Sequence, residues 1–257
     1  MSKSKKNYVD PTIILDHEGA DALRWYLISS NAPWMSTRFY EEAVKDTLGK
    51  FLLTYWNSYN FFTTYAILDA FDANKKLIPL SKRGLLDQWI ISRFNRLAAD
   101  VQEYMQGFET HKAARAIEDF VIDDFSNWYL RRSRKRLWTE EKTSDKLSGY
   151  HTMYDIFVSL SQLLAPFIPF ITEEIYQNLK TREMPESIHL CDYPKCDKKS
   201  INTDLENGME QIRALVESGR ALRSKINIKG RHPLPAATIV CPREVEKSTK
   251  PLLELVK

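Results

Sequence analysis

The chain is 257 residues long and carries 37 Lys and Arg against 34 Asp and Glu, which gives a formal net charge of +3. Hydrophobic residues make up 43% of the sequence and aromatic residues 12%, which is enough apolar material for a core and excludes a disordered chain. Only 8 Gly and 11 Pro are present, whereas average usage gives about 30 in total. This scarcity disfavours turn-rich all-β folds and Gly-looped nucleotide-binding sheets, and it predicts a mainly α protein.

The first part of the chain changes character near residue 39. Residues 1–38 are irregular apart from a short helical stretch at 19–30. From Phe39 onward, apolar side chains recur mostly at steps of three and four, which places them on one face of a helix. The spacing therefore predicts a long helix that ends before the polar stretch 72–76.

Five further helices are predicted by the same spacing in the rest of the chain. Proline separates two of them, because its ring removes a backbone donor and clashes with the preceding turn of a helix. The first of the five begins after Ser81 and ends at Gly107, and the second spans 111–138. The third runs from possible caps at 143–144 to Leu164, and the fourth follows Pro166 and Pro169 and continues through Leu179. The fifth covers 205–225.

The remaining segments complete the predicted domain plan. The stretch 181–204 is polar, contains two prolines and is typical of a linker. After the last helix, a basic loop and a β-like run at 237–241 predict the start of a small α/β unit, and the chain ends without a turn signal. We expect a loop and short helical segment at 1–38, a helical bundle at 39–180, a linker at 181–204 and a truncated C-terminal region at 205–257.

Cysteine and hydropathy patterns bear on location and metals. Cys191, Cys196 and Cys241 are too few and too scattered for a disulfide framework, so a reducing, cytoplasmic compartment is expected. A zinc site at Cys191 and Cys196 needs two more ligands, for which only His189 and Cys241 are nearby, so no metal site is assigned. No apolar run reaches the ~18 residues of a membrane span, and no membrane partner is expected.

The N-terminal segment Met1-Ser2-Lys3-Ser4-Lys5-Lys6-Asn7 combines closely spaced ammonium groups with hydroxyls. Such a loop can clamp a polyphosphate, because Lys is a compact point charge and Ser hydrogen-bonds phosphate oxygens. A start methionine followed by a frayed, Lys-rich terminus explains the same residues. The residues alone leave both interpretations open.

The segment 127–138 holds five cations within six positions, 131–136, flanked by two Trp and a Tyr. This combination neutralises phosphates and offers faces on which unpaired bases stack. A solvated helix end is the alternative, since cations also suit the C-terminal helix dipole. Trp128 is expected in the core under either interpretation.

Local acidic residues do not cancel this cluster. Asp119, Asp123 and Asp124 lie further from Arg131 than the three or four residues at which helical side chains pair. Only Glu140, after Arg136, has that spacing. We therefore expect most of the cluster to lack a partner on its own helix.

A second basic segment, 220–235, passes from a helix end into a loop and offers another contact for a phosphate backbone, although a plain charged linker fits equally well. The sequence contains no P-loop, GxGxxG, HExxH or nucleophile-elbow pattern. A complete active site is therefore not visible.

The N-terminal block reads MSKS at 1–4, followed by KKNYVDP. It is similar to the second signature of the class I aminoacyl-tRNA synthetases, Lys-Met-Ser-Lys-Ser, without its first lysine. GADALRWYLISSNAPW resembles the stem-contact region that follows the signature. The match continues through LLDQWIISRFNRL, DDFSNWYLRRSRKRLW, LLAPFIPFITEEIYQNL and RALRSKINIKGRHPLP, so the ordered set covers almost the whole chain.

Within the class, SNWYLRRSRKRLW and KSKKNYVDP look most like the isoleucine branch, particularly its archaeal and eukaryotic type, with the valine branch as the closest alternative. The resemblance implies a helical-bundle anticodon-binding domain, preceded by the signature loop and stem-contact region. It also implies tRNA(Ile) as partner, and ATP and Mg²⁺ as cofactors of a full ligase whose catalytic domain belongs to the same polypeptide.

The resemblance carries a catalytic role onto Lys3, the second lysine of the signature, which in the family contacts ATP phosphates during adenylate formation. Ser2 and Ser4 would shape the same ATP-binding loop. The chain contains no His-x-Gly-His partner motif. We therefore expect no bound cofactor and no aminoacylation by this chain alone.

The resemblance also assigns the basic segments to tRNA. Cations of 131–136 would contact anticodon-stem phosphates, two cations after the last helix would approach from the second unit, and one Trp would stack on an unpaired base. The competing class is a helical protein-interaction module with an incidental basic helix. The residues assigned to tRNA are Arg131, Arg132, Arg134, Lys135, Arg136, Trp138, Lys229 and Arg231.

Overall fold

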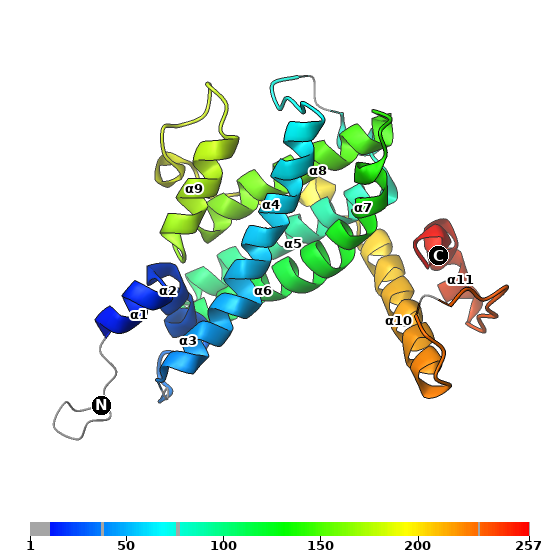
Figure 1. The fold of residues 1–257 in the computed structure, drawn as a ribbon, viewed down its shortest axis with the longest axis horizontal. Coiled ribbons are helices and arrows are strands. Elements are labelled where there is room, and N and C mark those ends of the chain that lie inside the picture. Colours follow the sequence, from blue (N-terminus) through cyan, green and yellow to red (C-terminus); the bar gives the residue numbers. More distant parts are fainter. Residues whose placement is uncertain (1–10, 37–38, 76–77, 231, 257) are drawn as a thin grey trace.

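The computed structural model describes residues 11–36, 39–75, 78–230 and 232–256, and these ranges contain helices and connecting segments but no strand (Figure 1). The mainly α prediction is confirmed. The helices are α1 (Pro11–His17), α2 (Ala20–Ser29), α3 (Glu41–Thr47), η2 (Leu48–Leu52), α4 (Leu53–Leu68), η3 (Leu80–Lys82), α5 (Leu85–Gln106), α6 (Thr110–Asp119), η4 (Phe120–Leu130), α7 (Arg131–Trp138), α8 (Ser144–Leu164), α9 (Pro169–Leu179), η5 (Ile188–Leu190), η6 (Lys198–Ser200), α10 (Thr203–Lys225), α11 (Arg243–Thr249) and η7 (Lys250–Val256).

Two of the long predicted helices contain wide, π-helical stretches. η2 joins α3 to α4, and the 11-residue η4 joins α6 to α7 without a break in helical backbone. In these stretches the backbone bonds span five residues instead of four. The helix predicted from Phe39 to before residue 72 and the helix predicted at 111–138 are therefore each one continuous rod that changes its pitch, over 41–68 and 110–138.

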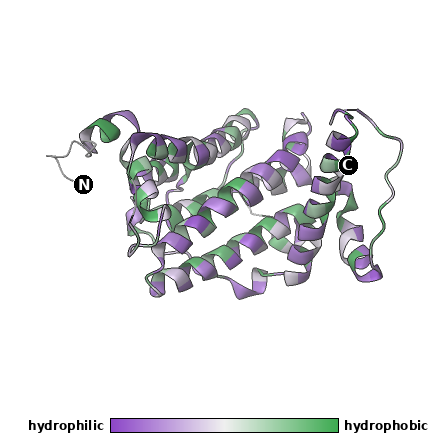
Figure 2. Cartoon of the chain, turned by 90° about the horizontal axis from the view of Figure 1, so that it is seen from below, coloured by the Kyte–Doolittle hydropathy of each residue, from purple (hydrophilic) through white to green (hydrophobic). Residues whose placement is uncertain are grey.

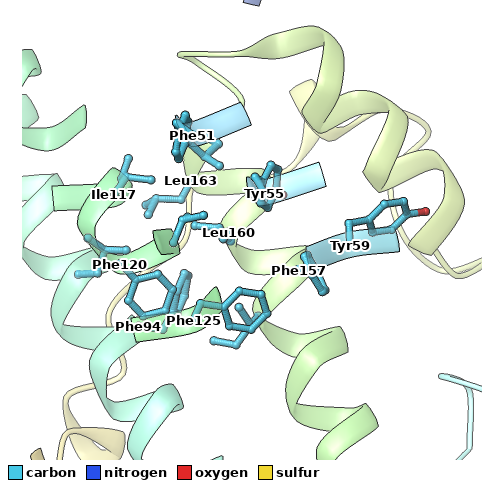
Figure 3. Close-up of a cluster of buried hydrophobic side chains, with 14 of the residues drawn as sticks. Phe51, Tyr55, Tyr59, Phe94, Ile117, Phe120, Phe125, Phe157, Leu160 and Leu163 are labelled. Carbon is cyan, nitrogen blue, oxygen red and sulfur yellow. The ribbon is translucent and has the colours of Figure 1, made fainter. Parts of the chain in front are cut away.

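The core is aromatic and lies between these two rods and α5 and α8 (Figure 3). Tyr55 and Phe157 are fully buried, and the Tyr55 hydroxyl is hydrogen-bonded to the hydroxyl of Ser161, with the two oxygens 2.7 Å apart. Burying a side chain of this size stabilises the fold by about 1.5–3 kcal/mol. Because the apolar residues follow the helical spacing, green hydrophobic and purple hydrophilic residues alternate along the helices in Figure 2.

Helix α2 is hydrogen-bonded to the junction between α8 and α9. The backbone N–H of Ile171 donates to Asp21 at 2.8 Å, so a side chain of α2 caps the start of α9. The Arg24 guanidinium donates to the carbonyl oxygens of Pro166 and Phe167, both at 2.9 Å. These contacts occupy backbone groups that the proline break between α8 and α9 leaves without helical partners.

The other end of α2 is held as well. Arg115 of α6 donates to the carbonyl of Ser29 at 3.0 Å, and Trp25 stacks on Phe51 with ring centroids 4.1 Å apart. The indole N–H of Trp25 also donates to Glu118 at 3.2 Å. Helices α1 and α2 therefore share the core of the bundle.

The segment 181–204, predicted as a linker, packs on the bundle. The Tyr176 hydroxyl donates to the carbonyl of Pro185 at 2.8 Å, and the N–H of Ile188 donates to Glu173 at 2.9 Å. Two short 3-10 turns, η5 and η6, lie within this otherwise mostly irregular segment.

The prediction of a β-like run at 237–241 is wrong. The segment is irregular, and Val240 is 94% exposed. The described ranges contain no strand beside it to pair its backbone groups, and β-branched residues do not form a strand without such a neighbour. α11 and η7 follow instead and pack on α10, which projects beyond the bundle (Figure 1).

Candidate nucleic-acid interface

The α7 cations fall into two groups. Arg131, Arg134 and Lys135 are exposed, whereas Arg132 and Arg136 are partly covered. In the described ranges, no acidic side chain forms an ion pair with Arg131, Arg132, Arg134 or Lys135. The expectation that most of the cluster lacks a local partner is confirmed, and a positive surface remains.

Arg136 does not belong to that surface. Its guanidinium donates to both carboxylate oxygens of Asp87, at 2.6 and 2.8 Å, and to the Tyr129 hydroxyl at 2.9 Å. The Arg136 side chain is 13% exposed and that of Asp87 is fully buried. A buried carboxylate of α5 therefore takes the charge of Arg136, and the assignment of Arg136 to tRNA stays a prediction.

The surroundings of this pair are matched to it. A Cβ on Gly149 of α8 would lie 3.0 Å from the Arg136 guanidinium carbon, so glycine leaves the space that the guanidinium occupies. Burial and then the negative charge of Asp87 raise the pKa of Tyr129 well above its ordinary value. Burial alone would lower the pKa of Arg136, but Tyr129 and Asp87 raise it. Tyr129 therefore stays a neutral donor to Asp87, and Arg136 stays charged.

Arg132 lies on the face of Trp128, with the guanidinium carbon 4.0 Å from the ring centroid. Trp128 is 7% exposed, which confirms its expected place in the core. The Arg132 Nε is buried and has no hydrogen-bond partner. Burial, followed by the positive charges of Arg220 and Arg131, lowers the pKa of Arg132. This cation is therefore partly buried, has like-charged neighbours and forms no ion pair in the part of the chain that the structure describes.

The exposed end of α7 also presents an aromatic face. Trp138 is 58% exposed. The Arg134 guanidinium lies over Phe61 of α4 at 5.6 Å, which holds this arginine against the bundle while its side chain stays in solvent. An exposed indole beside unpaired cations has the composition of a surface that binds single-stranded RNA.

The other predicted site residues lie elsewhere or outside the described residues. Lys229 is exposed in the loop after α10, where Arg223 donates to the carbonyls of Lys229 and His232, at 3.3 and 2.8 Å. Arg231 and the signature residues Ser2, Lys3 and Ser4 fall outside the ranges that the structure describes.

The structure adds a polar network that spacing along the sequence did not reveal. Asp124 of η4 accepts hydrogen bonds from Arg93 of α5, at 2.9 Å, and from Arg213 of α10. Glu206 of α10 accepts from Arg96 at 2.6 Å and from Ser92 at 2.5 Å. Because these partners are 31 to 114 positions apart, the local pairing rule could not find them. They fix the angle at which α10 leaves the bundle.

Across the described ranges, no group of three or more His, Cys, Asp or Glu is placed to hold a metal ion. None of the described helices combines the length and apolar character of a membrane span.

The described chain is a helical bundle with a basic, tryptophan-bearing rod, and α10, which carries three arginines, projects from it. The family model described as the anticodon-binding domain of tRNA ligase matches residues 87–238, and the model for class I tRNA synthetases of the I, L, M and V type matches residues 1–36. The chain belongs to the anticodon-binding domain family of the class I tRNA synthetases.

The curated relatives make the assignment more specific. Isoleucine–tRNA ligase of Clostridium tetani is 46% identical over 242 residues, which is 93% of this chain and 23% of the relative. The enzyme of the same name from Clostridium acetobutylicum is 47% identical over 91% of this chain and 23% of the relative. That from Dehalococcoides mccartyi strain CBDB1 is 42% identical over 96% of this chain and 25% of the relative. The chain thus spans about a quarter of the length of these relatives.

A solved structure shares the fold. The crystal structure of the agnB2 LeuRS–tRNA–LeuAMS ternary complex of Agrobacterium radiobacter K84 superposes with a TM-score of 0.59 at 19% sequence identity. The match covers 79% of this chain and 23% of that one. The archaeal and eukaryotic subtype stays a prediction.

Proposed function

We propose that this chain is the tRNA-binding part of an isoleucine–tRNA ligase and holds the anticodon stem-loop of tRNA(Ile). The observation that carries the proposal is the α7 surface, where Arg131, Arg134 and Lys135 are exposed without acidic partners beside the exposed Trp138. Cations neutralise phosphates and the indole stacks on an unpaired base. The family assignment and the names of the relatives support the same function.

The longer polypeptide would activate isoleucine with ATP and Mg²⁺ and attach it to tRNA(Ile) in the cytoplasm. Lys3 would contact the ATP phosphates, and Ser2 and Ser4 would shape its loop. Support for this comes from the match of residues 1–36 to the class I synthetase model. Lys229 and Arg231 would add contacts to tRNA from the loop after α10.

The direct test is a charge reversal on the exposed face of α7. Arg131 and Lys135 are four residues apart, so they share one side of the helix. In the Arg131→Glu/Lys135→Glu variant, we expect affinity for tRNA(Ile) to fall at least about tenfold at near-physiological salt, and the slope of log affinity against log salt to decrease by about 2. Filter binding over a salt series measures both quantities.

The matched control is the Lys180→Glu/Arg182→Glu variant. It reverses two cations that directly follow α9, at the other end of the bundle from α7 (Figure 1). It carries the same net charge change, so it should lose affinity only through the long-range field. Equal losses in the two variants would place the RNA surface elsewhere. Equal affinity of the parent chain for tRNA(Ile) and an unrelated tRNA would favour the protein-interaction module over this proposal.

A further inference from the structure

A cavity of about 400 Å³ opens where the end of α4 meets the start of α8. Its surface is mostly apolar and comes from the loop after α4 and from the first turns of α8. The main lining residues are Phe71, Ile78, Lys142, Leu147, Tyr150 and His151. A cavity of this size, with apolar and aromatic walls and a few polar groups, is typical of a site that takes a small ligand or a single ring system.

The walls of this cavity are already held in place by contacts within the chain. The Phe71 ring lies against two side chains of α8, with its centroid 5.4 Å from that of Tyr150 and 5.2 Å from that of His151. The buried Lys146 ammonium forms an ion pair with Asp69 at 2.6 Å, and the Tyr150 hydroxyl donates to the same carboxylate. A cavity that exists before the ligand arrives loses little conformational entropy when it is filled.

One polar atom in the wall has no partner. His151 is 4% exposed, and its Nδ1 is buried without a hydrogen-bond partner in the part of the chain that the structure describes. Burial, followed by the positive charge of Arg83, lowers the pKa of His151, and the negative charge of Asp155 opposes this only in part. The imidazole is therefore neutral at pH 7. A ligand with a polar edge would give it a hydrogen-bond partner, whereas an aliphatic ligand would not.

The cavity adjoins the α7 surface. The Lys146 ammonium in the cavity wall donates to the carbonyl of Thr139 at 2.6 Å, and Thr139 directly follows the exposed Trp138. Lys142 is exposed and also lines the cavity, so a cation is present at its edge. An RNA strand bound along α7 would therefore pass the opening, with a phosphate beside Lys142.

Resting on the proposed function, we propose that this cavity takes one unpaired base from the anticodon loop of the bound tRNA, with its face against Phe71 and its polar edge toward His151. Proteins recognise unpaired bases in this way, by stacking on aromatic side chains and by hydrogen bonds to the base edges. Aromatic walls, a neutral imidazole and a cation at the edge match the face, the edge and the phosphate of one nucleotide. The cavity would thus recognise a base, which the exposed cations of α7 cannot do.

An abasic scan tests the insertion in the 257-residue chain. The probes are synthetic tRNA(Ile) molecules, each lacking the base at one position of the anticodon loop. At the position whose base enters the cavity, we expect the affinity of the parent chain to fall about tenfold. Leu147→Trp should weaken intact tRNA(Ile) by a similar factor, because the indole fills the cavity, and it should lose nothing further with that abasic probe. Losses that multiply at every position would overturn the insertion.

The matched control is Leu53→Trp, the same substitution at an exposed position of α4 that does not line the cavity. It should leave the affinity within about twofold of the parent. A second cavity variant, His151→Phe, keeps a ring in the wall and removes both nitrogens. It should weaken intact tRNA(Ile) at least about threefold without changing the salt slope, because the lost contact carries no charge. Binding equal to that of the parent in both cavity variants would refute the insertion.

The same measurements separate this inference from the proposed function. If Arg131→Glu/Lys135→Glu weakens tRNA binding while both cavity variants bind like the parent, the RNA surface stands and the inserted base is wrong. If none of these variants changes tRNA affinity, both the surface and the inserted base are wrong.

Discussion

Arg132 and Arg136 are four residues apart and therefore point to the same side of α7, yet their charges are used differently. Arg136 meets a buried carboxylate, Asp87, at 2.6 Å, whereas Arg132 meets an aromatic face and other cations. The first charge is compensated inside the protein and contributes to folding. The second forms no ion pair among the described residues, so under the proposed function it is available to a phosphate.

Replacing Arg136 should therefore act on stability. Arg136→Gln leaves the buried Asp87 carboxylate without its cation, and we expect the free energy of unfolding to fall by about 3–5 kcal/mol. Urea denaturation followed by circular dichroism measures this. For the folded fraction, the salt slope of tRNA binding should not change.

Lys135→Gln is the control, because it removes one charge from the exposed side of the same helix and should shift stability by no more than about 0.5 kcal/mol. A loss below about 1 kcal/mol for Arg136→Gln, together with a reduced salt slope, would return Arg136 to the RNA-facing group.

These residues also show how far a sequence can be interpreted. The helices could be predicted because apolar spacing is a local property, and Trp128 could be placed in the core from the same spacing. The partner of Arg136 could not be predicted from the sequence, since Asp87 lies 49 positions away on another helix. The stacking of Arg132 on Trp128 did have a local signal, an aromatic residue and a cation at i and i+4.

At the scale of elements, the approach of α10 to α11 depends on one glycine. A Cβ on Gly208 would lie 2.8 Å from the Ser248 carbonyl oxygen and 3.2 Å from a Leu252 methyl group. Gly219 is in the same helix, and a Cβ there meets nothing within 4 Å. The first glycine is required by packing, whereas the second only weakens the helix.

Alanine at the two positions should have opposite effects. Gly208→Ala should push α11 away and raise amide hydrogen exchange across 243–256, with a loss of about 1–3 kcal/mol. Gly219→Ala should stabilise α10 by about 0.5–1 kcal/mol, because alanine loses less backbone freedom on folding. Thermal unfolding with hydrogen-exchange mass spectrometry distinguishes them, and equal shifts in the same direction would contradict the packing of α11 on α10.

The β-like run at 237–241 shows why a strand is harder to predict from sequence than a helix. Thr, Ile and Val favour strands, but a strand is stable only beside another strand, and the described ranges offer none. Helices satisfy their own backbone groups, so they could be predicted one at a time.

At the scale of the whole molecule, one cluster of buried apolar residues extends from Ile14 to Leu252. The proposed domain boundaries at 38 and 204 are thus crossed by a shared core, through Trp25 on one side and Met209 on the other. We expect the described chain to unfold in a single cooperative step as a consequence of this sharing.

The chain should nevertheless have no activity of its own. Residues 1–4 resemble the signature that would place Lys3 at the ATP phosphates, and the sequence contains no His-x-Gly-His motif that would act with it. We expect isoleucine-dependent exchange of pyrophosphate into ATP to stay at background with the purified chain, and full-length Clostridium tetani isoleucine–tRNA ligase serves as the positive control. Exchange that disappears in a Lys3→Ala variant would contradict this expectation.

The π-helical stretch η4 sets the rotational phase between the two ends of its rod. Its backbone bonds span five residues where those of an α-helix span four, so each of its residues turns less about the axis than the roughly 100° of an α-helical residue. If residues 120–130 kept their number but adopted α-helical bonding, the added rotation would turn α7 relative to α6, and Arg136 would leave Asp87. The pitch of η4 therefore decides which side of α7 faces α5.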